Sequence, residues 1–132
     1  MKRAFAVTGL IAALALLVGC SSAAAPATES STGAGDPAAG KQIFDTGGAS
    51  GIPCATCHTL DGSTLVGPSL QGIAERAGTR EKGLSAEDYI RQSIKTPSAF
   101  LVPGYGDLMN KTYAVTLSEQ DIDNLIAFLM TH

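Results

Sequence analysis

The sequence has few metal-binding and few basic side chains. Its 132 residues contain three cysteines, two histidines and no tryptophan, and nine lysines and arginines face twelve acidic residues, for a formal charge of −3. A chain with this charge lacks the basic surface expected of a nucleic-acid-binding protein. With 45% hydrophobic residues, it is also not a wholly disordered chain. One small domain is therefore expected.

Strand patterns are missing, and long apolar runs are missing beyond the N-terminus. No segment shows a convincing strand pattern, so we expect an all-α fold. The one long apolar run, Ala4 to Val18, is shorter than the roughly twenty residues that a membrane-spanning helix needs. Because Lys2 and Arg3 precede it, the run predicts a secretory signal.

The apolar run closes with Leu-Val-Gly-Cys at residues 17–20, which resembles the lipobox of bacterial lipoproteins. In that family the cysteine thiol receives a diacylglyceryl group and becomes the new N-terminus. The resemblance implies lipid on Cys20 and removal of residues 1–19, which would lower the formal charge from −3 to −5 through loss of two basic residues. An ordinary signal peptide with an accidental cysteine is the alternative.

The next segment, residues 20–35, is rich in Ser, Ala, Thr and Gly and shows no apolar period. It predicts a flexible tether that gives a folded domain reach from a membrane surface. A disordered terminus without a selected role would look the same. The folded domain is expected over residues 36–132.

Cys54, Cys57 and His58 form a C-x-x-C-H segment, the attachment sequence of a c-type haem. Two thiols three positions apart lie on one side of a helical turn, where they can form thioether bonds to the two vinyl groups on one porphyrin edge. The imidazole that follows can then reach the iron. A closed zinc site would need four ligands, and only Cys20 and His132 remain, at or near the chain ends.

Two further interpretations of these residues stay open. A thioredoxin-like redox pair would need strands around it, and none is indicated. Two buried structural cysteines beside a surface histidine would also fit the five-residue segment.

Three amphipathic helices are indicated, and a helical turn is expected over residues 70–77. Asp36 can cap the first helix, and Ser85 and Ser118 the other two, each serine followed by an aspartate three positions on. The expected buried faces are Gly40, Ile43 and Phe44, then Tyr89, Ile90 and Ile94, and finally Ile122, Leu125, Ile126, Phe128 and Leu129.

Residues 98–113 predict a loop of about sixteen residues, which is long for a compact domain and typical of functional or disordered loops. Its apolar residues, Met109 among them, make it unsuitable as a solvated tail. It must pack on something, and the face of a haem would serve.

Taken together, residues 36–132 resemble a class I cytochrome c. The resemblance is carried by the all-α pattern, the C-x-x-C-H segment, Gly-Pro-Ser-Leu at 67–70, a methionine in a long loop and a closing amphipathic helix. It implies one covalent haem c and first and last helices that cross, with Gly40 close to an aromatic, here Phe128.

The resemblance also implies the iron environment. The Pro68 carbonyl would accept a hydrogen bond from His58, and Met109 would be the sixth ligand. Met130 and His132 are the other candidates for that position. Asn110 follows Met109 where the family often has proline, which predicts a less rigid loop.

A haem with histidine and methionine ligands has no open position for a substrate, so the expected role is electron exchange rather than catalysis. The expectation is a lipid-anchored carrier outside the cytoplasm, between membrane complexes such as a quinol-oxidising complex and a terminal oxidase or reaction centre. Electrons would leave near Ile52, Pro53, Ala55 and Thr56. The lysines are scattered among acidic residues, which predicts weakly steered and largely apolar docking; ordinary solvated surface charges are the alternative. A haem sensor with an open sixth position and a fixed subunit of a larger redox complex are the alternatives.

Overall fold

A computed structural model describes residues 34–132, and this part of the chain consists of helices joined by loops, without strands. The expected all-α fold is thereby confirmed. Cys20 and the predicted tether up to residue 33 lie outside the described residues. None of the described helices is long and apolar enough to cross a membrane. The elements are α1 (Pro37–Thr46), η1 (Gly48–Ser50), η2 (Cys54–Thr56), α2 (Ile73–Ala77), α3 (Ala86–Lys95), η3 (Pro97–Ala99), α4 (Tyr113–Thr116) and α5 (Glu119–Leu129), where η marks a 3₁₀ turn.

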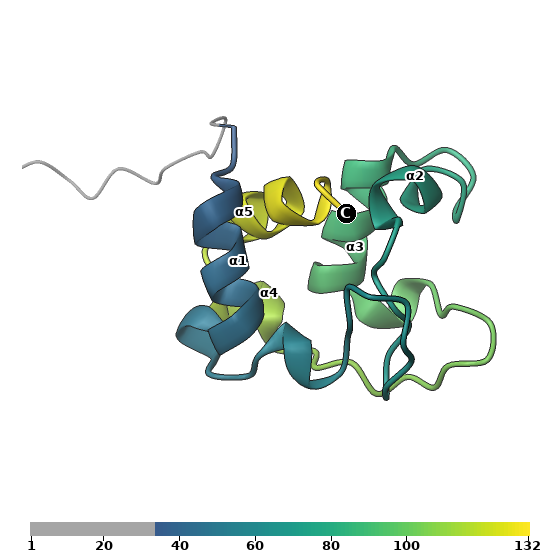
Figure 1. Cartoon of the computed structure of the whole chain (residues 1–132), viewed down its shortest axis with the longest axis horizontal. Helices are drawn as coiled ribbons and strands as arrows, with labels where there is room; N and C mark the ends of the chain where they lie inside the picture. Colours follow the sequence, from purple (N-terminus) through teal and green to yellow (C-terminus); the bar gives the residue numbers. More distant parts are fainter. Residues whose placement is uncertain (1–33) are drawn as a thin grey trace, which may run out of the picture.

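The first and last helices cross closely, as Figure 1 shows for α1 and α5. A Cβ on Gly40 would lie 2.0 Å from the backbone oxygen of Asn124 and 2.7 Å from the Cβ of Phe128, so only glycine fits at the crossing. Beside it, the rings of Phe44 and Phe128 pack with centroids 5.5 Å apart. The crossing that the family resemblance implied is present.

A buried amide fixes the start of α1 on α5. The Oδ1 atom of Asn124 accepts hydrogen bonds from the backbone N–H of Asp36, at 2.8 Å, and from the side chain of Gln120, at 3.0 Å. A buried polar atom without a hydrogen-bond partner destabilises a folded protein. The two bonds give the buried side-chain oxygen of Asn124 its partners inside the apolar crossing. The apolar pattern of α5 gave no indication of this role.

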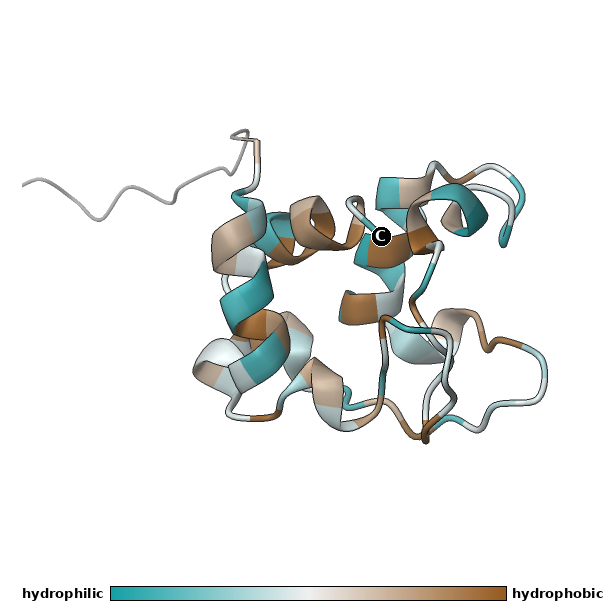
Figure 2. Cartoon of the chain, in the orientation of Figure 1, coloured by the Kyte–Doolittle hydropathy of each residue, from teal (hydrophilic) through white to brown (hydrophobic). Residues whose placement is uncertain are grey.

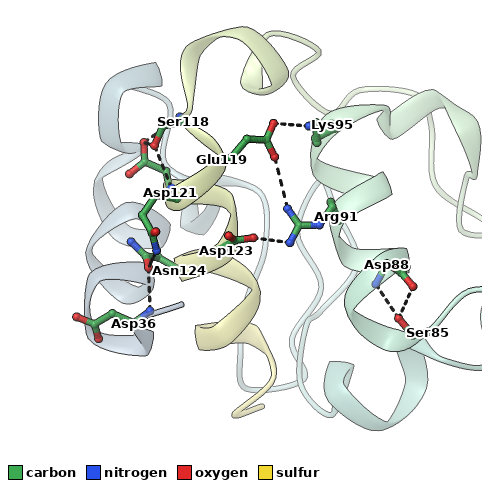
Figure 3. Close-up of polar contacts among 11 residues, drawn as sticks. Asp36, Ser85, Asp88, Arg91, Lys95, Ser118, Glu119, Asp121, Asp123 and Asn124 are labelled. Atoms are coloured by element: carbon green, nitrogen blue, oxygen red, sulfur yellow. Dashed lines mark hydrogen bonds and ion pairs between the residues drawn. The ribbon is translucent and has the colours of Figure 1, made fainter. Parts of the chain in front are cut away.

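Charged side chains join α3 to α5, as Figure 3 shows. Arg91 pairs with Asp123 and lies 3.6 Å from Glu119, which also pairs with Lys95. Glu119 and Asp123 of α5 therefore link it to α3, and Glu119 also lies in the first turn, where it faces the positive end of the helix dipole. The serine caps are as expected: the Ser85 side chain accepts from the backbone N–H of Asp88, and Ser118 forms a capping box with Asp121.

Two segments differ from expectation. The turn expected over residues 70–77 is helical only from Ile73 onwards. Gly72, directly before Ile73, has a left-handed conformation with φ +65°, and a right-handed helix cannot include such a residue. The predicted loop 98–113 begins inside η3 and ends at the first residue of α4. This helix has only four residues, too few to show an apolar period in the sequence.

Candidate functional site

A large apolar cavity lies between the helices and the loops that join them. It is lined by the side chains that the sequence singles out: Cys54, Cys57, His58 and Met109. The core residues Phe44, Ile73, Ile94 and Leu125 form part of the same wall. Figure 2 shows hydrophobic stretches in the loops along the lower edge of the view as well as in the helices. The cavity therefore shares part of its wall with the hydrophobic core.

The two cysteines lie on one tight turn. Cys54 begins η2, and its backbone oxygen accepts hydrogen bonds from the N–H groups of Cys57, at 3.1 Å, and His58, at 3.0 Å. This turn brings both thiols to the same cavity. Burial raises the pKa of the Cys54 thiol to about 11, so the thiol is un-ionised at neutral pH.

The His58 ring is held by the segment that follows it. Its Nδ1–H donates to the backbone oxygen of Pro68 over 2.8 Å, which leaves the lone pair of Nε2 for another partner. A Cβ on Gly67 would lie 2.5 Å from Cε1 of the ring, so glycine lets the backbone pass directly against the imidazole. Burial lowers the pKa of His58, opposed in part by the bond to Pro68, and so favours the neutral ring.

One arginine, which the sequence did not indicate, organises the chain after Pro68. The Arg76 guanidinium donates to the backbone oxygens of Ser69 at 3.0 Å, Gln71 at 2.5 Å and Gly72 at 3.2 Å. The carbonyls of Ser69 and Gln71, which lie outside the helices, thereby gain a partner, and that of Gly72 also accepts from the Arg76 backbone N–H. Arg76 therefore holds the chain that directly follows Pro68, whose carbonyl accepts the hydrogen bond from His58.

The apolar loop packs along the cavity, as expected. Phe100, Leu101, Val102, Leu108 and Met109 all belong to its lining. Among the described residues Met130 lines a different depression, beside Ala34 and Gly35, and the ring of His132 packs on Phe128 with centroids 4.8 Å apart. Of the three side chains considered for one axial position, Met109 alone lines this cavity.

A hydrogen-bonded turn follows Met109. The Asn110 side chain accepts from the backbone N–H of Thr112 at 3.1 Å and donates to its hydroxyl at 2.9 Å. This turn leads directly into α4. A hydrogen-bonded asparagine turn thus stands where the family often has proline, and the expected loss of rigidity stays a prediction.

A tyrosine joins this segment to the cysteine loop. Tyr113 is 5% exposed, and its hydroxyl donates to the backbone oxygen of Ile52 over 3.0 Å. Burial, with a smaller contribution from the two neighbouring cysteines, raises the pKa of Tyr113 to about 12. Sequence reasoning did not identify this contact, because the two residues are 61 positions apart.

The donor set fits a covalently attached haem. Two thiols on one turn, an imidazole with one nitrogen free and a thioether share an apolar cavity, and Arg80 contributes a cation suited to carboxylates. Within residues 34–132 no group of three or more His, Cys, Asp or Glu side chains is placed to hold a metal ion.

Comparison with known proteins agrees with this geometry. The family model for cytochrome c matches residues 37–132. The chain belongs to the cytochrome c family. It is 30% identical over 105 residues to cytochrome c2 of Rhodoblastus acidophilus, covering 73% of this chain and 92% of that protein. It is 29% identical over 106 residues to cytochrome c of Tetrahymena pyriformis, covering 72% and 87%. As a member of this family, it is an electron-transfer protein that binds one covalent haem c and is not an enzyme.

Proposed function

We propose that this cytochrome c is a membrane-anchored monohaem carrier that shuttles single electrons between respiratory or photosynthetic complexes. Cys54 and Cys57 would form the thioether bonds, and His58 and Met109 would be the axial ligands. The observation that carries the proposal is the lining of one apolar cavity by all four side chains, with Met130 and His132 elsewhere.

The haem supplies reversible one-electron chemistry at its iron when it is bound. The Pro68 carbonyl orients the His58 ring and makes it a stronger donor. The soft sulfur of Met109 favours the ferrous state, and the apolar lining excludes water, so both raise the reduction potential. Arg80 would pair with the haem propionates.

Absorption spectra of the purified protein, with and without carbon monoxide, test this assignment. A six-coordinate iron should show the sulfur-to-ferric-iron charge-transfer band and should hardly react with carbon monoxide after reduction. Rapid binding of carbon monoxide by the wild type would instead support a haem sensor with an open sixth position.

The anchor in this proposal is a diacylglyceryl group on Cys20, with residues 1–19 removed, residues 20–35 as the tether and residues 36–132 as the folded domain. Two acyl chains bury enough methylene groups for stable attachment to an extracytoplasmic membrane face. The support is the lipobox-like sequence at 17–20. Cell fractionation checks it: the wild type should be in the membrane fraction, and Cys20→Ala should give soluble or uncleaved protein. Wild type found wholly in the soluble fraction would refute the anchor.

Partner docking in this proposal is weakly steered and largely apolar. Residues 46–74 and 97–110 carry most of the cavity lining, and each stretch has a single Asp, Glu, Lys or Arg residue, Asp61 and Asp107. Asp107 is paired with Lys111 at 3.0 Å. Ile52, Ala55 and Thr56, where electron exit is expected, are exposed beside the cysteine turn. A quinol-oxidising complex and a terminal oxidase or reaction centre are the partner classes that we propose.

A further inference from the structure

The hydroxyl of Tyr113 lies outside the proposed set of haem-binding groups, yet it joins the two segments that carry them. Tyr113 comes four residues after Met109, and its partner Ile52 comes two residues before Cys54. The hydroxyl donates to the Ile52 carbonyl over 3.0 Å. This single bond therefore connects the methionine segment to the start of the C-x-x-C-H turn.

The chain on the C-terminal side of Met109 can transmit this restraint. The asparagine turn at 110–112 leads without a break into α4, whose first residue is Tyr113. The Thr112 backbone oxygen accepts from the N–H groups of Val115 and Thr116, both at 3.0 Å. A restraint on Tyr113 is thus passed to Met109 through a short, hydrogen-bonded connection.

The chain on the N-terminal side of Met109 contains two glycines. It runs through Pro103, Gly104, Tyr105 and Gly106, and Gly104 has a φ of +90° with nothing within 4 Å of the position that a Cβ would occupy. Glycines give a chain the largest conformational freedom. Asp107, two residues before Met109, accepts a hydrogen bond from the Ser98 hydroxyl and pairs with Lys111. Met109 is therefore restrained on both sides, and the C-terminal restraint is the one in which Tyr113 takes part.

We propose that the Tyr113 hydroxyl is a latch: a positioning residue that holds Met109 against the haem iron by binding the segment ahead of the cysteines. The inference rests on the proposed role of Met109 as axial ligand. Its consequence is competition: each time the latch opens, the methionine sulfur can leave and an added ligand can take its place. Tyr113 is buried whereas Ile52 is exposed, so water compensates the loss of the bond only in part.

Imidazole titration of the ferric holoprotein tests the latch. Tyr113→Phe keeps the ring and removes only the hydroxyl, so the imidazole affinity should rise roughly three- to tenfold, the effect of one net hydrogen bond. Tyr105→Phe is the matched control, because that tyrosine also lines the cavity and no hydrogen bond of its hydroxyl is found within residues 34–132. Its imidazole affinity should stay near the wild-type value.

Equal imidazole affinities in wild type and Tyr113→Phe would overturn the latch, even if Tyr113→Phe lowered the midpoint of chemical unfolding. That pattern would mean a purely structural tyrosine. If Tyr113→Phe incorporates haem poorly, Asn110→Ala loosens the same connection nearer to Met109 and should also raise the imidazole affinity. No rise in Asn110→Ala would then count against the proposal.

Failure of the axial assignment looks different. If the wild type lacked the sulfur-to-iron charge-transfer band, or if Met109→Ala kept it, the proposed ligand itself would be wrong. A different result overturns the latch alone. In that case the charge-transfer band is present and is lost in Met109→Ala, but Tyr113→Phe has the same imidazole affinity as the wild type.

Discussion

At the scale of single residues, small and polar groups decide how the reactive side chains are presented. Gly67 brings the backbone against the His58 ring, and the carbonyl of the next residue, Pro68, accepts its Nδ1–H. Arg76 then fixes the chain beyond. Three residues that are not reactive themselves thus determine how the imidazole is oriented. The lone pair of its Nε2 atom is left available to bind a haem iron.

Replacing Met109 with alanine should abolish the charge-transfer band and open the reduced iron to carbon monoxide. The reason is that Met109 lines the cavity and supplies its thioether. Met130→Ala is the control, since Met130 lines a different depression, and it should leave both properties unchanged. The reverse pattern in absorption spectra of the two variants would mean that Met130 is the ligand.

At the scale of elements, the crossing of α1 and α5 is the tightest contact. It depends on Gly40, where a side chain would meet the Asn124 backbone, and on the amide of Asn124, which receives the N–H of Asp36. Ion pairs from Arg91 then hold α3 beside α5. The helices that frame the cavity are therefore fixed to one another away from the haem-binding residues.

Gly40→Ala should lower the free energy of unfolding by about 2 kcal/mol or more, because overpacking at the crossing exceeds the gain of about 1 kcal/mol in helix propensity. Denaturant titration of the holoprotein measures this. Gly78→Ala is the control: its φ is −66° and its Cβ would lie 3.5 Å from the nearest atom, an ordinary contact. A Gly40→Ala protein as stable as the control would show that the helices can move apart at little cost.

At the scale of the whole molecule, the core and the cavity share one wall. Phe44, Ile73 and Leu125 belong both to the core cluster and to the cavity lining. A small domain has a modest core, and this one surrounds a space that an apolar group would fill. Fold stability and haem attachment are therefore coupled.

Protein that lacks haem should accordingly be largely unfolded. Far-ultraviolet circular dichroism of Cys54→Ser/Cys57→Ser protein produced without haem, compared with the wild-type holoprotein, measures the helical content. A marked fall is expected, because the short helices lose the surface on which they pack. Native helicity in the haem-free chain would show that α1, α3 and α5 hold the fold by themselves.

Electron transfer to a membrane oxidase should depend weakly on ionic strength. Lys41, Lys95 and Lys111 are each paired with an acidic side chain, and the stretches that line the cavity are almost free of charge. Such a surface exerts little long-range steering. Stopped-flow rates measured across a range of salt concentrations check this, and a steep fall with added salt would contradict apolar docking.

The sequence by itself determined the features that rest on local chemistry. The serine caps, Pro37 at the first position of α1 and the apolar faces of α1, α3 and α5 are found where their spacing predicts, because each depends on neighbours within a turn or two. The C-x-x-C-H segment likewise indicated haem c, because two thiols and an imidazole at this spacing have few other uses.

Only the tertiary structure decided which distant groups meet. The contacts of Asn124 with Asp36 and of Tyr113 with Ile52 join residues 88 and 61 positions apart, and no periodicity marks either pair. Helix α4 is too short to show an apolar repeat. The turn at 110–112 depends on a hydrogen bond from the Thr112 backbone to the Asn110 side chain, which no sequence pattern indicates. Tertiary packing also decided which of three candidate side chains lines the cavity: Met109, Met130 or His132. The outcome depends on how α5 and the long loop pack against the same core, which no local pattern indicates.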